Sequence, residues 1–176
     1  GQGYIQTTPI QLCLMTAQIA NGGYKIYPKI IVEDKKNNQP DDKFQQLYKN
    51  SRNIKIVQDA MFGSTNEVMG TSYRSRINDP EYQFAGKTGT AQVKKITERD
   101  RELDLKTFEI PYEERDHALY VAFGPYKNPR YAISIIVEHG GNGSTTAAPM
   151  AKKLFKLIID RHKLRQSITN KNYLEI

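Results

Sequence analysis

QFAGKTGTAQV, residues Gln83–Val93, is the stretch that decides the fold. It predicts a short strand that contains two glycines, and glycines weaken a strand unless a ligand or another backbone must approach closely. After a charged connector from Lys94 to Arg115, the runs Ala118–Phe123 and Tyr131–Glu138 alternate in side-chain character and predict two more strands. PYKNP at 125–129 predicts the tight turn of an antiparallel hairpin between them.

Helical patterns lie on both sides of these strands. Thr8 is placed to cap a helix, with Pro9 at its first position and Gln11 completing a capping box, and NGG at 21–23 ends it. A second helix is predicted over Ile54–Asn66. Residues Tyr24 to Val32 are rich in β-formers, and the polar stretch Asp34–Asp42 indicates a surface loop.

A last helix is predicted after the glycine-rich turn Gly140–Gly143. Thr145 or Thr146 is placed to cap it, and Pro149 falls in its first turn. We expect its buried stripe to consist of Met150, Leu154, Leu157 and Ile158, and the polar tail from Arg161 onward to fray. Three antiparallel strands with flanking helices place residues 1–176 in the α+β class, as part of one domain.

Composition narrows the possible partners. The 176 residues are 38% hydrophobic and 26% charged, with a net charge of +7, but the basic residues are mixed with acids and do not predict nucleic-acid binding. The single cysteine, Cys13, excludes an internal disulfide and a zinc site of paired cysteines, and its apolar neighbours indicate a core position. The three histidines lack the spacing of metal ligands, so we expect neither metal nor cofactor.

Gly86-Lys87-Thr88 also matches the end of a phosphate-binding loop. That motif requires a glycine at position 81, which is Glu81, and a helix directly after Thr88, where Gly89 and β-prone residues stand. Nucleotide binding is therefore not predicted.

The second interpretation of this strand is the Lys-Thr-Gly-Thr element of serine acyl-transferases. The order of motifs along the whole chain resembles class B penicillin-binding proteins: GQGY at 1–4, TP at 8–9, NGG at 21–23, KTGTAQ at 87–92, VEHGG at 137–141 and AAP at 147–149. DHALYVAFGPY at 116–126 is similar to the elongation-specific type, penicillin-binding protein 2. The resemblance implies the C-terminal part of a transpeptidase domain of the penicillin-binding protein and β-lactamase fold.

The resemblance implies roles for four residues of the strand. Lys87 would supply a positive field and hydrogen-bond to a serine of a neighbouring motif. The backbone N–H of Thr90 would be one of two oxyanion-hole donors. The hydroxyls of Thr88 and Thr90 would bind the carboxylate of the donor peptide, and Gly89 would keep its approach open.

The nucleophile of this family is absent from the chain. It sits in a Ser-x-x-Lys motif, and none of the seven serines is followed by lysine at that spacing. Ser51-Arg52-Asn53 matches the family's Ser-x-Asn motif, but that motif belongs before residues 1–4, so we interpret Ser51 as a helix cap. The chain begins at Gly1 without a targeting leader, and its apolar runs are too short to span a bilayer. We therefore expect a fragment, inactive alone, whose anchor and nucleophile lie upstream.

By resemblance, the parent protein would be a D,D-transpeptidase on the periplasmic face of the bacterial inner membrane. It would cross-link peptidoglycan stem peptides through an acyl-serine intermediate, bind β-lactams, and work with a membrane glycosyltransferase and cell-elongation scaffold proteins. The alternative is a penicillin-binding-like module that binds peptide without catalysis.

Overall fold

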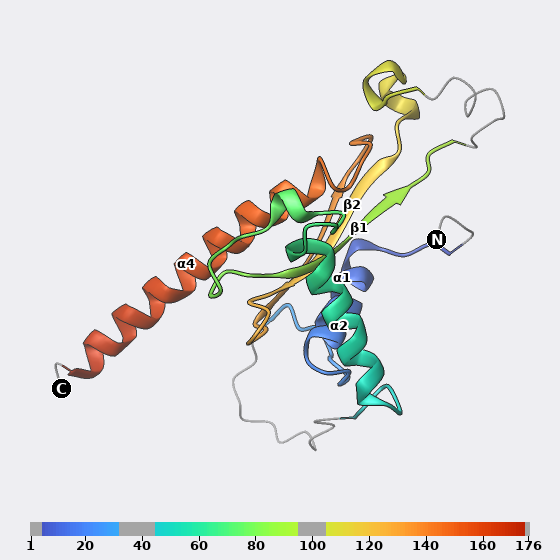
Figure 1. Ribbon diagram of the computed structural model, residues 1–176. Coiled ribbons are helices and arrows are strands. Elements are labelled where there is room, and N and C mark those ends of the chain that lie inside the picture. The colour runs from blue at the N-terminus through green and yellow to red at the C-terminus, as the bar shows by residue number, and fades with distance from the viewer. Residues whose placement is uncertain (1–4, 32–44, 95–104, 175–176) are drawn as a thin grey trace.

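The computed structural model describes residues 5–31, 45–94 and 105–174 (Figure 1). The predicted motif at 1–4, the predicted loop at 34–42 and part of the connector after Lys94 lie outside the described residues. The elements in chain order are α1 (Pro9–Ala20), α2 (Ser51–Asn66), η1 (Tyr73–Ser75), β1 (Ala85–Ala91), η2 (Thr107–Glu109), η3 (Tyr112–Glu114), β2 (His117–Gly124), β3 (Tyr131–Val137) and α4 (Ala147–Leu174).

The three predicted strands form one antiparallel sheet in the order β1-β2-β3. Thr88 on β1 pairs with Tyr120 on β2, which pairs with Ile135 on β3, so the register agrees with the alternation in the sequence. The predicted hairpin joins β2 to β3. The α+β class with three antiparallel strands and flanking helices is confirmed.

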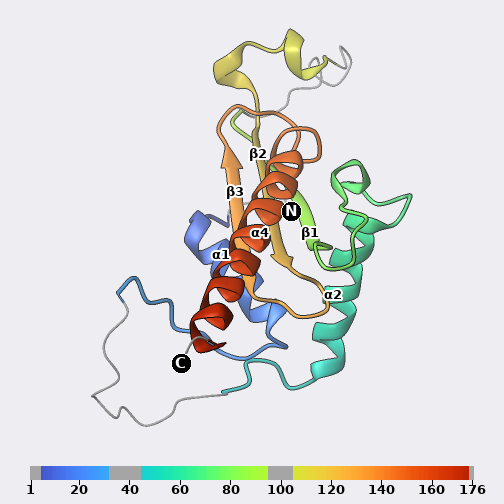
Figure 2. The ribbon, with the colours of Figure 1, turned by 90° about the vertical axis from the view of Figure 1, so that its left-hand side faces the viewer.

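The helices cover the two faces of the sheet separately (Figures 1 and 2). On one face, α4 packs on Tyr120 and its small neighbours Ala118 and Ala122, all of which are buried. On the other face, α1 and α2 pack around Ala85 and Phe123. The core is thus split into two layers, with the sheet between them.

The starts of α1 and α2 follow from their capping residues. As predicted, the Thr8 hydroxyl accepts from Gln11 N–H at 3.4 Å and the Gln11 side chain accepts from Thr8 N–H at 2.8 Å. The prediction that Ser51 caps a helix is wrong, because Ser51 is the first helical residue. The cap is Asn50, whose side chain accepts from the N–H of Arg52 at 3.0 Å.

The buried face of α4 differs from the predicted stripe. The buried side chains are Ala147, Ala148, Ala151, Phe155 and Ile159, which recur every three or four residues and interlock with the sheet. Of the predicted stripe, Met150 and Leu154 are exposed, Leu157 is 65% exposed and Ile158 is half-buried. The buried alanines let the helix approach the sheet closely, and this choice of face depends on contacts distant in sequence.

Two other expectations also fail. The tail from Arg161 continues as helix to Leu174, so His162 lies within α4 rather than near its end. The β-rich segment from Tyr24 forms no strand in its described part, 24–31, and makes only an isolated bridge between Tyr24 and Gln46.

Thr146 directly precedes α4, but the hydroxyls of the predicted caps Thr145 and Thr146 act as donors to the preceding turn rather than as acceptors for the helix. The hydroxyls of Thr145 and Thr146 donate to the carbonyl oxygens of Asn142 and Gly140, at 3.3 and 2.9 Å, and tie the turn to the start of α4. Cys13 is half-buried, its thiol lies 3.4 Å from the Ala132 carbonyl oxygen, and burial raises its pKa. Among the helices that the structure describes, none is long and apolar enough to cross a membrane.

Candidate active site

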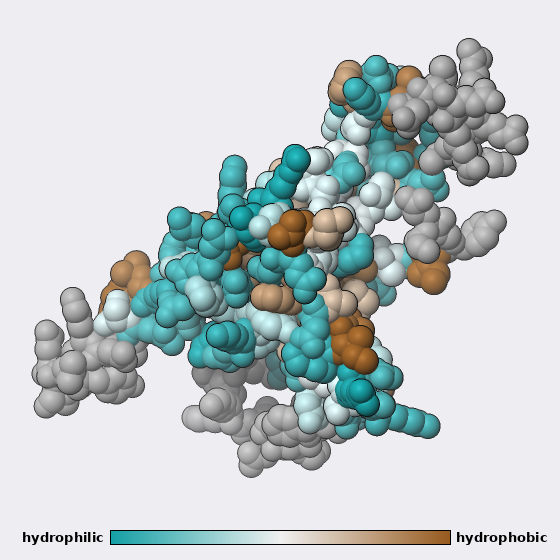
Figure 3. Space-filling model, in the orientation of Figure 1, coloured by the Kyte–Doolittle hydropathy of each residue, from teal (hydrophilic) through white to brown (hydrophobic). Residues whose placement is uncertain are grey.

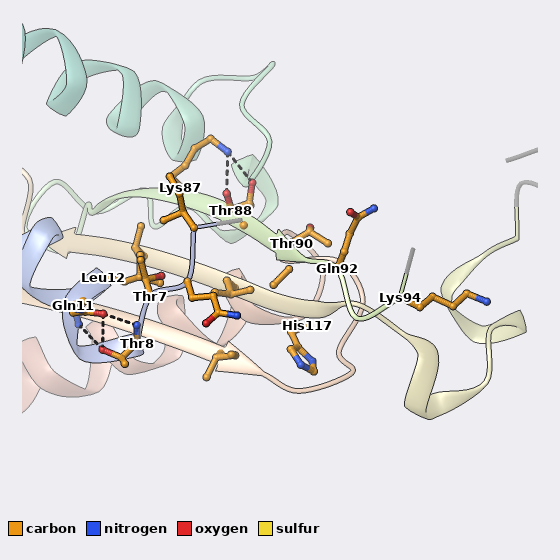
Figure 4. Close-up of a pocket in the computed structure, with 17 residues that line it drawn as sticks. Thr7, Thr8, Gln11, Leu12, Lys87, Thr88, Thr90, Gln92, Lys94 and His117 are labelled. Carbon is orange, nitrogen blue, oxygen red and sulfur yellow. Dashed lines mark hydrogen bonds between the residues drawn. The ribbon is translucent and has the colours of Figure 1, made fainter. Parts of the chain in front are cut away.

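A cleft of about 1080 Å³ lies between the β1–β2 surface and the segment that leads into α1 (Figure 4). Its wall includes all four residues of the Lys-Thr-Gly-Thr motif. The full lining is Ile5, Gln6, Thr7, Thr8, Gln11, Leu12, Lys87, Thr88, Gly89, Thr90, Ala91, Gln92, Lys94, His117, Leu119, Val121 and Ile136.

The pairing of β1 with β2 determines which residues form the sheet side of the cleft. Lys87 pairs with Val121, Gly89 with Leu119 and Ala91 with His117, and all six residues line the cleft. These residues share one face because alternate residues of a strand point to the same side, and Thr88 and Thr90 between them also line the cleft at the outer strand of the described sheet. The motif therefore lies in the β1 wall of the cleft.

Lys87 is exposed and folds back along its own strand. Its Nζ donates to the Thr88 carbonyl oxygen at 2.9 Å and to the Thr88 hydroxyl at 3.3 Å. Figure 4 shows both contacts at the rim of the cleft. Both contacts are to neutral oxygens of the next residue, and no carboxylate among the described residues bonds to this ammonium group.

The two glycines of the motif serve different purposes. A Cβ on Gly86 would overlap the hydroxyl and ring of buried Tyr120, so this glycine permits core packing on the α4 side. A Cβ on Gly89 would meet only the Cβ of Leu119, at 3.2 Å, on the cleft side. Only Gly89 therefore fits the prediction that a glycine keeps the strand open to a ligand.

Sequence reasoning missed a third glycine beside the motif. A Cβ on Gly143 would lie 2.5 Å from the Leu119 carbonyl oxygen and 2.7 Å from that of Gly89. The turn after β3 therefore rests directly on the backbone of the motif strand. The glycine-rich composition of Gly140–Gly143 is the available signal, but by itself it predicts a turn and no contact with the motif strand.

His117, which lines the cleft, contacts His139, which lies outside the cleft lining, and no role was predicted for either. Their ring centroids are 4.8 Å apart, and the His117 Nδ1 accepts from the His139 backbone N–H at 2.9 Å. That bond requires Nδ1 of His117 to be unprotonated. The His139 Nδ1 lies 3.1 Å from the carbonyl oxygen of Arg115, and a φ of 52° at His139 brings the two histidines together. The residues that the structure describes include no group of three metal-ligating side chains.

The segment that follows β1 is tied to the start of β2. The Val93 N–H donates to the Asp116 carboxylate at 3.3 Å, and Lys94 forms an exposed ion pair with Glu114 at 2.6 Å. These contacts continue the β1–β2 pairing beyond the motif. None of the seven serines, all of which are described, lines the cleft.

Comparison with known proteins decides the family. The profile of the family described as penicillin binding protein transpeptidase domain matches residues 1–156. The chain belongs to the penicillin-binding protein transpeptidase family. The resemblance drawn from its motifs is therefore confirmed.

Several relatives of the chain within the penicillin-binding protein family are peptidoglycan D,D-transpeptidases named MrdA. The chain is 34% identical over 166 residues to the peptidoglycan D,D-transpeptidase MrdA of Salmonella typhimurium and 29% identical over 175 residues to MrdA of Escherichia coli K12. It covers 26% of the length of each, and these alignments take in 91% and 97% of this chain. The chain thus spans about a quarter of the curated relatives it matches.

Solved penicillin-binding proteins share the fold. The chain resembles PBP2 of Pseudomonas aeruginosa in complex with WCK 5153, with a TM-score of 0.69 and 34% identity over 89% of this chain and 31% of that one. It resembles PBP2 of Helicobacter pylori in complex with MreC, with a TM-score of 0.68 and 30% identity over 91% of this chain and 26% of that one.

Proposed function

We propose that this chain forms the β-edge of the active site of a peptidoglycan D,D-transpeptidase. The observation that carries the proposal is a cleft lined by Lys87, Thr88, Gly89 and Thr90 in a chain of this family, with no serine in its wall. In this proposal residues 1–176 are the C-terminal part of one transpeptidase domain. The nucleophilic serine and the Ser-x-Asn motif come from polypeptide outside them.

The donor peptide binds along β1. Within the described residues β1 pairs with β2 on one side only, so its other edge can pair with an extended peptide. Gly89 allows that backbone to come close, since its α-hydrogen faces open space apart from Leu119. The hydroxyls of Thr88 and Thr90 hold the donor carboxylate, and the Lys87 ammonium strengthens the positive field that attracts it.

Chemistry at the carbonyl needs a serine supplied from outside the chain. The hydroxyl oxygen of this serine attacks the carbonyl carbon of the donor peptide. The C–N bond to the leaving amine then breaks, and the amine departs with the proton that the serine has lost. The Thr90 N–H donates to the oxygen that becomes negative in the transition state, and removing one such donor typically lowers the rate about 10²- to 10³-fold. Lys87 hydrogen-bonds to the neighbouring Ser-x-Asn serine. A second stem peptide then takes the acyl group from the serine.

Substrates and partners follow from this assignment. The substrates are peptidoglycan stem peptides, with β-lactams as mimics, and no cofactor or metal takes part. The whole protein acts at the periplasmic face of the bacterial inner membrane, anchored by a segment outside the chain. It works with a membrane glycosyltransferase and with elongation scaffold proteins. The complex of Helicobacter pylori PBP2 with MreC supports the scaffold partners only.

Intact-mass measurement after incubation with benzylpenicillin tests the proposal. The 176-residue chain alone should gain no adduct, and a longer polypeptide that adds the upstream part should gain one penicilloyl group. Labelling of the short chain would reveal a nucleophile within it and overturn the division of the site. Absence of labelling in the longer protein, with no Ser-x-x-Lys in its sequence, would favour a peptide-binding module without catalysis.

A further inference from the structure

A second cavity of about 470 Å³ lies on the α4 side of the sheet, whereas the active-site cleft lies on the α1 side. One wall is the segment between η1 and β1, and the other is the first half of α4. Figure 3 shows hydrophilic side chains gathered where this segment lies in front of α4. Its lining is Arg74, Arg76, Ile77, Asn78, Asp79, Tyr82, Lys152 and Lys156.

The lining carries four cations against one carboxylate. Arg74 and Arg76 come from the segment before β1, and Lys152 and Lys156 from α4. The Asp79 carboxylate accepts the N–H of Glu81 at 2.9 Å, so it already serves the local turn. The cavity therefore has a surplus of positive charge contributed by two separate elements.

Among the described residues, no carboxylate forms an ion pair with these cations. Across the described ranges, Arg74, Lys152 and Lys156 form no ion pair or hydrogen bond with another side chain. Lys152 and Lys156 stand four residues apart on one helix face, where like charges repel. A bound anion would offset that repulsion.

Parts of the cavity are held in place. The guanidinium of Arg76 stacks on the Tyr73 ring at 3.9 Å and donates to the Tyr73 carbonyl oxygen at 3.4 Å. The Tyr82 hydroxyl donates to Asp160, and Lys163 lies 4.2 Å from the centre of its ring. Arg76 and Tyr82 are both half-buried. These contacts fix the positions of their side chains in the wall of the cavity.

We propose that this cavity binds a phosphate-bearing anion. Two arginines offer planar forks that match phosphate oxygens, and two lysines add point charges from the facing helix. Half-buried Ile77 and Tyr82 give the site an apolar wall against which an ester-linked group can pack. The site is separate from the transpeptidase cleft and does not depend on the proposed reaction.

Titration calorimetry of the chain with inorganic pyrophosphate at physiological salt tests the site. Far-UV circular dichroism confirms that each variant is folded. Lys152→Gln with Lys156→Gln should weaken binding about tenfold or more, since two charge-assisted contacts are lost. The matched control is Lys49→Gln with Lys127→Gln, two exposed lysines outside the cavity, with an expected change below about twofold. Arg74→Lys keeps the charge but loses the fork, and should also weaken binding.

A second arm distinguishes the source of the phosphate. Binding to phosphatidylglycerol vesicles but not to phosphatidylcholine vesicles, lost in the Lys152 and Lys156 variant, would assign a lipid headgroup. Pyrophosphate binding without vesicle binding would assign a soluble phosphate ester. Equal loss in the control variant, or no saturable binding of either probe, would overturn the proposal.

Discussion

Gly86 and Gly89 look equivalent in the sequence, yet their surroundings give them different roles. Gly86 faces buried Tyr120, and Gly89 faces the cleft beside Leu119. The prediction that glycines in this strand admit a ligand thus fits one of the two. Tyr120 itself could not be recognised as the reason for Gly86, because the pairing of β1 with β2 brings together residues that are distant in the sequence.

Alanine substitutions should separate these two roles. Gly86→Ala should lower the free energy of unfolding by about 1–3 kcal/mol, because its methyl group overlaps Tyr120 in a packed core. Gly89→Ala should cost less stability, yet slow acylation by benzylpenicillin in a longer polypeptide that includes the upstream part. Urea unfolding and labelling rates provide the two measurements. Equal stability of the two variants would contradict the assignment.

Tyr120 joins three elements through its hydroxyl, which lies 2.9 Å from those of both Thr65 and Ser72. Burial raises its pKa above the ordinary 10.0. Above pH 10 the unfolded chain loses this proton while the folded chain keeps it, so the stabilising contribution is lost as pH rises through the folded-state pKa. Tyr120→Phe should cost about 1 kcal/mol at pH 7 and should flatten the fall in stability above pH 10. Urea midpoints between pH 7 and 11 test both effects, and an unchanged slope would contradict the second.

Among the elements, α4 shows where a helical pattern misleads. Its largest aliphatic side chains suggested the buried stripe, but small alanines and Phe155 face the sheet. Phe155 stacks on Phe84 with ring centroids 4.9 Å apart, just before the motif strand. The packing of α4 thus supports the strand that carries the candidate site.

Truncating one residue on each side of α4 tests which face is buried. Phe155→Ala should lower the free energy of unfolding by about 3–5 kcal/mol, because it empties a core position against Phe84. Leu157→Ala should change it by no more than about 0.5 kcal/mol, since Leu157 is 65% exposed. Urea unfolding of both variants measures the difference. A larger loss for Leu157→Ala would mean that the predicted stripe faces the core after all.

At the scale of the whole molecule, the described sheet ends at β1 on one side and β3 on the other. Unpaired strand edges are usually covered in folded proteins. Ile136 on β3 is 42% exposed, and the outward side of α4 is apolar at Met150 and Leu157. We infer that polypeptide outside the chain continues the sheet beside β3.

Amide hydrogen exchange tests this proposed completion. In the 176-residue chain, β2 amides should exchange slowest, because β2 is paired on both sides, and about half of the β3 amides should exchange fast. In a longer polypeptide that includes the upstream part, those outward β3 amides should become protected. Unchanged exchange along β3 would contradict a sheet continued at that edge.

The sequence by itself determined the three strands, the capping box of α1, the motif strand of the site and the family, because these depend on neighbouring residues and local periodicity. Only the tertiary structure decided which face of α4 is buried, why Gly86 is glycine, that Gly143 rests on Gly89 and that His117 contacts His139. Each of these depends on contacts between segments distant in the chain, whose packing no local pattern records.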